Sequence, residues 1–305
     1  SSFNYYLPLN LVHSMSTEPK TWRIIDMLKW AESYFGEHGF PHPRRDIEVL
    51  LQDLLHCSRV DLYLRFDEPL DRNQLDKLRS WIKRRTKKEP IQYITGKTEF
   101  YGLEMEVNDS VLIPRPETER LVDVAIHTLG QNGTSKILDI GTGSGCIAIA
   151  LAHEMPQAHI TAVDIHDAAL DLANTNSKRH NVNNIEFRQM DFLKEIPGGN
   201  FDMIVCNPPY VPEIEMESLM PDVRDYEPRT ALTDGIDGLT FYHRLAQTGP
   251  DMLKHRGWMI MEVGLEDHPE NAKAIFQNYP YGSLELISDY NGDPRVLKVR
   301  LTQDE

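Results

Sequence analysis

The stretch Asn-Pro-Pro-Tyr at 207–210 combines side chains that can hold a planar nitrogen group. It directly follows FDMIVC (201–206), an apolar run that predicts a buried strand. Pro208 fixes its own φ and favours an extended conformation at Asn207, which aims the Asn207 side chain. Since Pro208 and Pro209 donate no N–H, the loop presents carbonyl acceptors. Asn207 adds its side-chain carbonyl and Tyr210 an aromatic face. We therefore predict a site for a planar amide or amine.

The chemistry that suits such a site is methylation of the bound nitrogen, which is a poor nucleophile because its lone pair is delocalised. Two acceptors on its hydrogens favour a more pyramidal nitrogen and stabilise the positive charge that develops as a methyl group arrives. Alignment with the methyl donor supplies much of the remaining acceleration. Asn207, Pro208 and Tyr210 are therefore the predicted catalytic residues, and Pro209 completes the predicted substrate loop. This chemistry needs no side-chain nucleophile and no metal ion.

A second stretch, LDIGTGSGCIAIALA (138–152), predicts a strand, a glycine-rich turn and a helix. Its alternating glycines, which let a ligand approach the backbone closely, are Gly141, Gly143 and Gly145. The order differs from the dinucleotide fingerprint, because Cys146 stands where the third glycine of that fingerprint would be. Asp139 would repel a pyrophosphate but suits a cationic amino-acid end. These features resemble the first motif of class I S-adenosylmethionine-dependent methyltransferases.

Residues at the ends of the next two strands are predicted to bind the adenosine of that donor. Asp164 ends the second strand, where an acid can accept hydrogen bonds from both ribose hydroxyls. Asp191 and Phe192 follow the third strand and are predicted to flank the adenine, one by a polar contact and one by packing. The full predicted cofactor-binding set is Asp139, Gly141, Thr142, Gly143, Ser144, Gly145, Asp164, Asp191, Phe192 and Asn207.

The elements that must position these residues form two regions. Residues 17–88 predict a small helical bundle, with an apolar stripe from Trp22 to Phe35, a helix opened by Pro43 and another capped by Asp71. Residues 89–113 predict a β-hairpin linker. Within 114–305, strands are predicted at 136–140, 159–164, 185–189, 201–206 and 257–263, and helices at 117–129, 145–154, 167–180 and 238–254. Two more strands, joined by an NGDP turn, follow. This pattern predicts an α/β fold with a mostly parallel, Rossmann-like sheet and an antiparallel edge.

Charge is distributed unevenly over the 305 residues, whose formal net charge is −15. Residues 17–90 hold 15 Lys and Arg against 13 Asp and Glu, so the remainder carries −17. An acidic body repels a nucleic-acid backbone, and we expect no stable nucleic-acid binding. The exception is RSWIKRRTKK (79–88), with six basic residues in ten, which we interpret either as a solvated helix end or as a contact for an acidic protein face or ribosomal RNA.

Other features place the chain in a broad class. Three scattered cysteines suit a reducing cytoplasm, where we expect the protein to be found, and the twelve histidines show no metal-ligand spacing. No apolar run approaches the length that spans a membrane, so we expect a soluble protein. Residues 1–16 lack any charged side chain, and we interpret them as a leader that cloning can introduce, with the natural start near Met15.

Three stretches taken together resemble one family. They are EPIQYITGKTEFYG (89–102), LIPRPETE (112–119) and NPPY, and the resemblance runs from about residue 17 to the C-terminus. It is to the PrmC/HemK family, whose members methylate the N5 of the glutamine in the Gly-Gly-Gln loop of class 1 peptide release factors and so tune translation termination. The resemblance implies S-adenosylmethionine as cofactor and residues 207–210 as the glutamine site. Arg115 lines the substrate mouth in this interpretation, and the helical domain recognises the release factor. At the position of Phe192 some relatives carry Trp.

Three other functions remain open from the residues alone. NPPY also occurs in adenine-N6 methyltransferases, but these need a broad basic surface for nucleic acid. A nucleotide-dependent oxidoreductase would share the strand–turn–helix unit, but the spacing of the glycines and the presence of NPPY disfavour this function. A catalytically silent adaptor that binds release factors would not need an intact NPPY. We therefore expect a protein glutamine methyltransferase.

Overall fold

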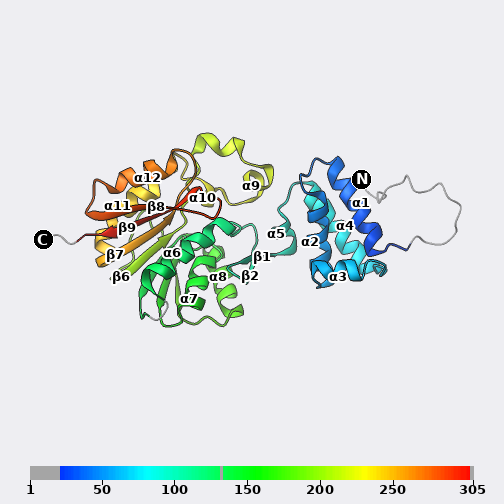
Figure 1. The fold of residues 1–305 in the computed structure, drawn as a ribbon, viewed down its shortest axis with the longest axis horizontal. Coiled ribbons are helices and arrows are strands. Elements are labelled where there is room, and N and C mark those ends of the chain that lie inside the picture. Colours follow the sequence, from blue (N-terminus) through cyan, green and yellow to red (C-terminus); the bar gives the residue numbers. More distant parts are fainter. Residues whose placement is uncertain (1–20, 131–132, 303–305) are drawn as a thin grey trace. The chain divides into compact units, whose positions relative to one another are not determined.

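The computed structural model describes residues 21–130 and 133–302, so the predicted leader at 1–16 lies outside the described residues. The chain divides into two compact units, Ser1–Lys87 and Lys88–Glu305 (Figure 1). The hairpin expected to link two domains belongs to the second of these units.

The described part of the first unit is a bundle of helices. Their bounds are Ile24–Glu37 (α1), Pro43–Leu55 (α2), Arg59–Leu64 (α3) and Arg72–Thr86 (α4). Leu28, Leu50 and Leu78 are fully buried between them, and Asp71 caps α4 by accepting a hydrogen bond from the Gln74 N–H at 2.8 Å. The three predicted helices are thus confirmed. Helix α3 was not predicted, because its six residues are too short to show a periodic apolar pattern.

The basic end of α4 is partly used inside the bundle. Arg85 forms an ion pair with Asp46 at 2.8 Å, and its guanidinium lies 4.6 Å from the ring centroid of Phe40. Both charged side chains of that pair are largely buried. Arg85 therefore stabilises the packing of α4 on α2, whereas Lys83 and Lys87 are exposed at the same end.

The second unit begins with a short helix, Ile91–Thr95 (α5), and the predicted hairpin. The hairpin consists of strands Lys97–Phe100 (β1) and Leu103–Glu106 (β2), which pair antiparallel. At its turn, the Tyr101 N–H donates to Glu119 at 2.8 Å, which fixes the hairpin to the start of the following helix. Asn176 holds the other end, because its side chain accepts from the Glu106 N–H at 2.7 Å and donates to the Glu106 carbonyl at 3.0 Å.

Beside the β1–β2 hairpin, the described residues of the second unit form a sheet of seven strands in the order β5-β4-β3-β6-β7-β9-β8. The strand bounds are Lys136–Ile140 (β3), His159–Asp164 (β4), Ile185–Gln189 (β5), Phe201–Cys206 (β6), Leu253–Glu262 (β7), Tyr281–Ser288 (β8) and Pro294–Leu301 (β9). All pairs from β5 to β7 are parallel, and β9 runs antiparallel to both β7 and β8. The predicted antiparallel edge is therefore the β8–β9 hairpin, in which β8 is outermost.

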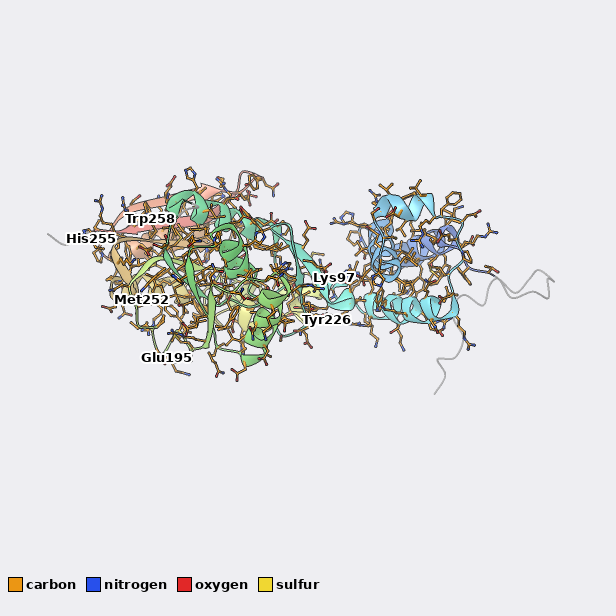
Figure 2. All side chains as sticks on the ribbon, turned by 90° about the horizontal axis from the view of Figure 1, so that it is seen from below. Lys97, Glu195, Tyr226, Met252, His255 and Trp258 are labelled. Carbon is orange, nitrogen blue, oxygen red and sulfur yellow. The ribbon has the colours of Figure 1, made fainter. Side chains whose placement is uncertain are left out.

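Helices cover both faces of this sheet (Figure 1). Their bounds are Pro116–Thr118 (η2, a 3-10 helix), Glu119–Leu129 (α6), Cys146–Glu154 (α7), Asp167–Arg179 (α8), Thr240–Met252 (α11) and His268–Phe276 (α12). Alternate strand residues face opposite layers: Met203 and Val205 pack with α6 and α7, whereas Ile204 and Cys206 pack with α11 and α12. The predicted α/β fold is thereby confirmed. The ring of Trp258 in β7, labelled in Figure 2, packs against two cations of β9. Its centroid lies 4.6 Å from Nζ of Lys298 and 4.7 Å from Cζ of Arg300.

The segment between β6 and α11 contains structure that the sequence did not predict. It holds the short helices Glu213–Ser218 (η3), Pro221–Tyr226 (α9) and Arg229–Leu232 (α10). Its chain returns beside the Asn-Pro-Pro-Tyr loop, because the Val211 N–H donates to the Leu232 carbonyl at 2.9 Å and the Glu213 N–H to the Ile236 carbonyl at 3.0 Å. Residues 211–238 therefore support the loop that follows β6.

Candidate active site

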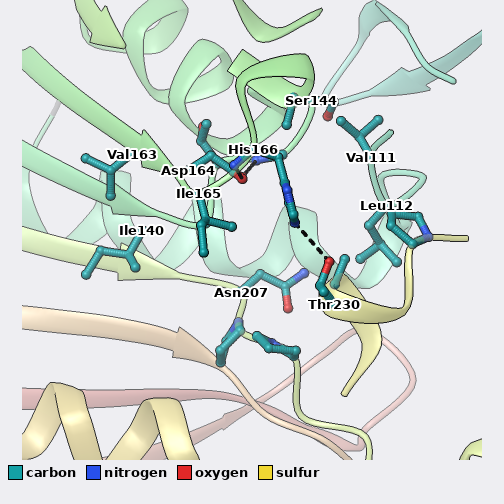
Figure 3. A pocket seen from close by; sticks show the side chains of 18 of the residues that line it. Val111, Leu112, Ile140, Ser144, Val163, Asp164, Ile165, His166, Asn207 and Thr230 are labelled. Carbon is teal, nitrogen blue, oxygen red and sulfur yellow. Dashed lines mark hydrogen bonds between the residues drawn. The ribbon is translucent and has the colours of Figure 1, made fainter. Parts of the chain in front are cut away.

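A cavity of about 330 Å³ opens at the carboxyl ends of the parallel strands (Figure 3). The strand order reverses between β3 and β6, and open α/β sheets bind ligands at such a point. The glycine turn follows β3 and Asn207 follows β6, so the two predicted motifs flank it. The predicted site residues that line the cavity are Arg115, Gly141, Thr142, Gly143, Ser144, Asp164, Asp191, Phe192, Asn207, Pro208 and Pro209. Asp139, Gly145 and Tyr210 are not among the lining residues.

The three glycines of the turn have two structural roles, one at the cavity and one in helix packing. All three have positive φ, which favours glycine. A Cβ on Gly141 or Gly143 would meet nothing within 4 Å, so their backbones face open space at the cavity. A Cβ on Gly145 would instead lie 2.9 Å from the Cβ of Ala173 in α8. Gly145 was predicted to approach the ligand, but in the structure its missing side chain lets helices α7 and α8 pack closely.

Asp139 lies fully buried behind this turn. Its Oδ2 accepts a hydrogen bond from the Thr142 hydroxyl at 2.7 Å, and Thr142 lines the cavity. Its Oδ1 has no hydrogen-bond partner among the described residues. Burial, together with the nearby charge of Asp164, raises the pKa of Asp139 to about 7, against the opposing effect of the Thr142 hydrogen bond. The carboxyl group therefore favours a positively charged group brought close to it.

Asp164 ends β4 at the rim of the cavity. Its two carboxylate oxygens accept backbone hydrogen bonds, from the Gly143 N–H at 2.9 Å and from the His166 N–H at 3.0 Å. Each oxygen can accept a second hydrogen bond, which leaves capacity for the two hydroxyls of a ribose. Asp164 thus also fixes the glycine turn against the next strand.

Asp191 and Phe192 lie beside Asp164, at the end of β5. Asp191 forms an ion pair with Lys194 at 2.7 Å, and this lysine lowers the pKa of the Asp191 carboxyl. Phe192 is nearly buried and stacks on Phe241, with ring centroids 6.3 Å apart. Phe192 therefore forms an apolar wall of the cavity, which suits the packing role predicted for it.

Asn207 is held by a chain of hydrogen bonds that the sequence did not reveal. Its Nδ2 lies 3.4 Å from the Thr118 hydroxyl, and that hydroxyl donates to Oε2 of Glu262 at 2.6 Å. Glu262 is buried at the end of β7, on the same sheet edge as Asn207. Burial raises the pKa of Glu262, while its hydrogen bonds with Thr118 and Tyr210 act in the opposite direction.

Tyr210 takes a different place from the one predicted. Its hydroxyl donates to Oε1 of Glu262 at 2.9 Å, and its ring lies 5.7 Å from the His268 ring. The pKa of Tyr210 is raised well above its usual value, first by burial and then by the Glu262 carboxylate. In this structure Tyr210 packs behind the loop and shares Glu262 with Thr118, and its aromatic face does not cover the cavity.

The cavity is covered by the segment that contains α10. Glu227, which is buried, accepts from the Ile113 N–H at 3.0 Å and forms an ion pair with Arg115. Within α10, the Thr230 hydroxyl lies 3.1 Å from Nε2 of His166 (Figure 3). Arg115 thus lines the cavity with its guanidinium directed to Glu227, and its contact with the substrate stays a prediction.

The residues present fit S-adenosylmethionine. The cavity has the size of a small-molecule site, and it combines open glycine backbone, an acid at the ribose position and an apolar wall. The buried Asp139 carboxyl lies behind the glycine turn, where its charge would favour a cationic amino-acid end in the cavity.

Comparison with known proteins identifies the family. Residues 26–96 match the model of the PrmC N-terminal domain and residues 121–221 that of the methyltransferase small domain. The release factor glutamine methyltransferase of Geobacter sulfurreducens is 39% identical over 94% of this chain and 100% of its own length. The chain belongs to the family of release factor glutamine methyltransferases. The Bacillus subtilis enzyme of this family is 37% identical over 90% of this chain and 96% of its own.

The fold of this methyltransferase is shared with more distant proteins. A methyltransferase from Pyrococcus furiosus matches 76% of this chain and 99% of its own, with a TM-score of 0.50 and 18% identity. The methyl donor of the family is S-adenosylmethionine. In the described parts of the chain, none of the helices is long and apolar enough to cross a membrane. Among the same residues, His, Cys, Asp and Glu form no group of three or more that is placed to hold a metal ion.

Proposed function

We propose that this enzyme transfers a methyl group from S-adenosylmethionine to the N5 side-chain nitrogen of the glutamine in the Gly-Gly-Gln loop of class 1 release factors. The observation that carries the proposal is Asn207, held by Thr118 at the cavity edge beside Pro208, in a chain similar over nearly its whole length to release factor glutamine methyltransferases. The site suits a planar amide, because Asn207 and Pro208 supply carbonyl acceptors for its N–H₂ group.

The mechanism depends on what the residues of this chain do to that amide. S-adenosylmethionine supplies an electrophilic methyl group when it is bound. The Asn207 and Pro208 carbonyls accept hydrogen bonds from the glutamine nitrogen, orient its lone pair and stabilise positive charge as it develops. The segment that contains Glu227 and α10 lines one side of the cavity and would limit the access of water to the reacting atoms. The bond from the methyl group to the donor sulfur would break as the new N–C bond forms, and the nitrogen would then release one proton to solvent.

The predicted domain roles complete the proposal. The helical region at 17–88 would recognise the folded release factor, the hairpin region at 89–113 would join it to the catalytic part, and 114–305 would bind the cofactor and the glutamine. The match of residues 26–96 to the PrmC N-terminal domain supports a family-specific role for the helical region.

The test is transfer of radiolabelled methyl groups from S-adenosylmethionine to purified release factor. We expect label on the wild-type factor, none on a factor whose loop glutamine is changed to alanine, and a loss of at least about a hundredfold in rate for Asn207→Ala. Transfer RNA, ribosomal RNA and DNA serve as alternative substrates. Label on a nucleic acid instead of the factor would reject the proposal and favour the adenine-N6 alternative.

A further inference from the structure

We infer that Thr118 and Glu262 are positioning residues that set which way the Asn207 side-chain amide faces, with its oxygen toward the substrate. The inference deepens the proposed function and rests on it, because it concerns the acceptor that binds the glutamine nitrogen. The three residues come from different parts of the chain, since Thr118 ends η2, Asn207 follows β6 and Glu262 ends β7.

The direction of the hydrogen bonds starts at Glu262. Both of its oxygens receive a hydroxyl, from Thr118 at 2.6 Å and from Tyr210 at 2.9 Å. A hydroxyl has one proton to donate. With that proton committed to Glu262, the Thr118 oxygen faces Asn207 as an acceptor only.

An acceptor at this position distinguishes the two ends of the Asn207 amide. The amide nitrogen has two protons and the amide oxygen has none, so only the nitrogen can form a favourable contact with the Thr118 oxygen. Nδ2 lies 3.4 Å from that oxygen, and the opposite end of the amide, Oδ1, is thereby left for the cavity that Asn207 lines. A turned amide would place two oxygens against each other at Thr118 and offer a donor to the glutamine N–H₂ group.

Burial restricts the direction in which the Thr118 hydroxyl can donate. Thr118 and Glu262 are each about 1% exposed, so water cannot replace a lost partner. The charge of Arg295 acts against the effect of burial on the Glu262 carboxyl, in the same direction as the two hydroxyls that its oxygens receive. The hydroxyl proton of Thr118 therefore has one favourable direction, toward Glu262.

The experiment compares Thr118→Val, Thr118→Ser and Glu262→Gln in methyl transfer to intact release factor. Thr118→Val keeps the shape and removes the hydroxyl, so we expect kcat to fall about ten- to a hundredfold, a range typical for a misplaced catalytic group. Cofactor affinity should change less than kcat, because the hydroxyl removed from Thr118 acts on Asn207, although Thr118 also lines the cavity, and Glu262 does not line it. Thr118→Ser keeps the hydroxyl and should restore most of the rate. Glu262→Gln replaces one acceptor by a donor and should also lower kcat.

The double variant Thr118→Val, Glu262→Gln tests whether the two residues act through Asn207 along one path. In that case the double variant has about the same kcat as the single variant with the lower kcat. If the two residues acted independently, the fold-losses in kcat of the single variants would multiply. Thr248→Val is the matched control, because Thr248 is also buried and donates its hydroxyl within α11, to the Arg244 carbonyl at 2.7 Å. The Thr248→Val variant should have a lower thermal stability than the wild type but the same kcat.

Two results would overturn the inference: an unchanged kcat in Thr118→Val, or equal losses in Thr118→Val and Thr118→Ser. A wild-type enzyme that labels the release factor while these variants behave like Thr248→Val would reject the positioning role alone. A wild-type enzyme that leaves the factor unlabelled would reject the proposed function itself, so the two failures are distinguishable.

Discussion

At the scale of single residues, the site is built around carboxyl groups that are buried next to neutral donors. Asp139 and Glu262 both have a raised pKa because burial disfavours their charged forms. Asp139 receives one hydroxyl, that of Thr142, while Glu262 receives two. Asp139 is therefore suited to interact with a cation. Glu262 instead sets the direction in which the Thr118 and Tyr210 hydroxyls donate.

The raised pKa of Asp139 predicts a pH dependence of stability in the ligand-free enzyme. Its pKa is about 7 when folded, against 3.8 when exposed, so the folded state holds a proton that the unfolded state has lost. The stabilisation is complete below pH 4 and disappears as the pH rises to 7 and above. For the wild type relative to Asp139→Asn, the free energy of unfolding should fall by about 3 kcal/mol between pH 5 and pH 8. Urea unfolding at several pH values measures this difference, and parallel curves for the two proteins would contradict it.

At the scale of elements, the loop after β6 depends on close contact with a second loop. Gly238 has a φ of +79°, and a Cβ there would lie 2.1 Å from the Tyr210 carbonyl oxygen. The turn that carries Gly238 is fixed by Asp234, which accepts from the N–H groups of Gly238 and Thr240 at 2.9 and 3.0 Å. The geometry of Asn-Pro-Pro-Tyr is therefore imposed partly from residues about 30 positions later.

Gly238→Ala should displace this loop and lower kcat for methyl transfer by at least about tenfold, because small misplacements of binding groups are costly. Gly235→Ala is the matched control, since Gly235 has a φ of +80° but a Cβ there would meet nothing within 4 Å. The control carries the same backbone strain, about 1 kcal/mol, without the collision. Equal kcat values in the two variants would show that the contact with Tyr210 is not required.

The sequence predicted the sheet more fully than the cover of the site. The bounds of β3, β4, β5 and β6 agree with the prediction, because each is a short apolar run between clear helix and turn signals. Residues 211–238 show no such periodicity, and backbone pairing with distant residues and the Asp234 side chain determine their structure. Thr118 and Glu262 were missed for a related reason: one is a short polar side chain in LIPRPETE, the other a strand end, and only the fold brings them together. Tyr210 and Gly145 were assigned to ligands because spacing alone cannot distinguish a residue that faces a ligand from one that packs behind it.

At the scale of the whole molecule, charge separates the two units. Residues 17–90 are slightly basic in an otherwise acidic chain, and the basic excess includes the end of α4. At this end of α4, Arg85 contacts Asp46 and Phe40 inside the helical bundle. A change of Arg85 would therefore affect folding as well as binding of the release factor. The exposed Lys83 and Lys87 test the contact with the protein substrate more directly.

Changing Lys83 and Lys87 together to serine should raise the KM for intact release factor about two- to fivefold, more at low than at high salt, while cofactor affinity stays constant. Exposed charges at the edge of an interface contribute modestly, which limits the expected effect. Lys29→Ser combined with Arg72→Ser removes the same charge from exposed positions elsewhere on the bundle and serves as control. An identical KM for both double variants and the wild type would leave the basic end as a solvated helix terminus.

The hydrogen bond between Thr118 and Glu262 joins residues 144 positions apart, and the bond between Ile113 and Glu227 spans 114. Contacts of such long range are slow to form, because closing a long loop costs chain entropy before the contact stabilises the fold. During synthesis, the glycine turn and Asn207 emerge from the ribosome well before Glu262, which ends β7. A growing chain therefore carries both sequence motifs before Glu262, which we infer to position Asn207, has been synthesised, and we expect methyl transfer only after β7 has joined the sheet.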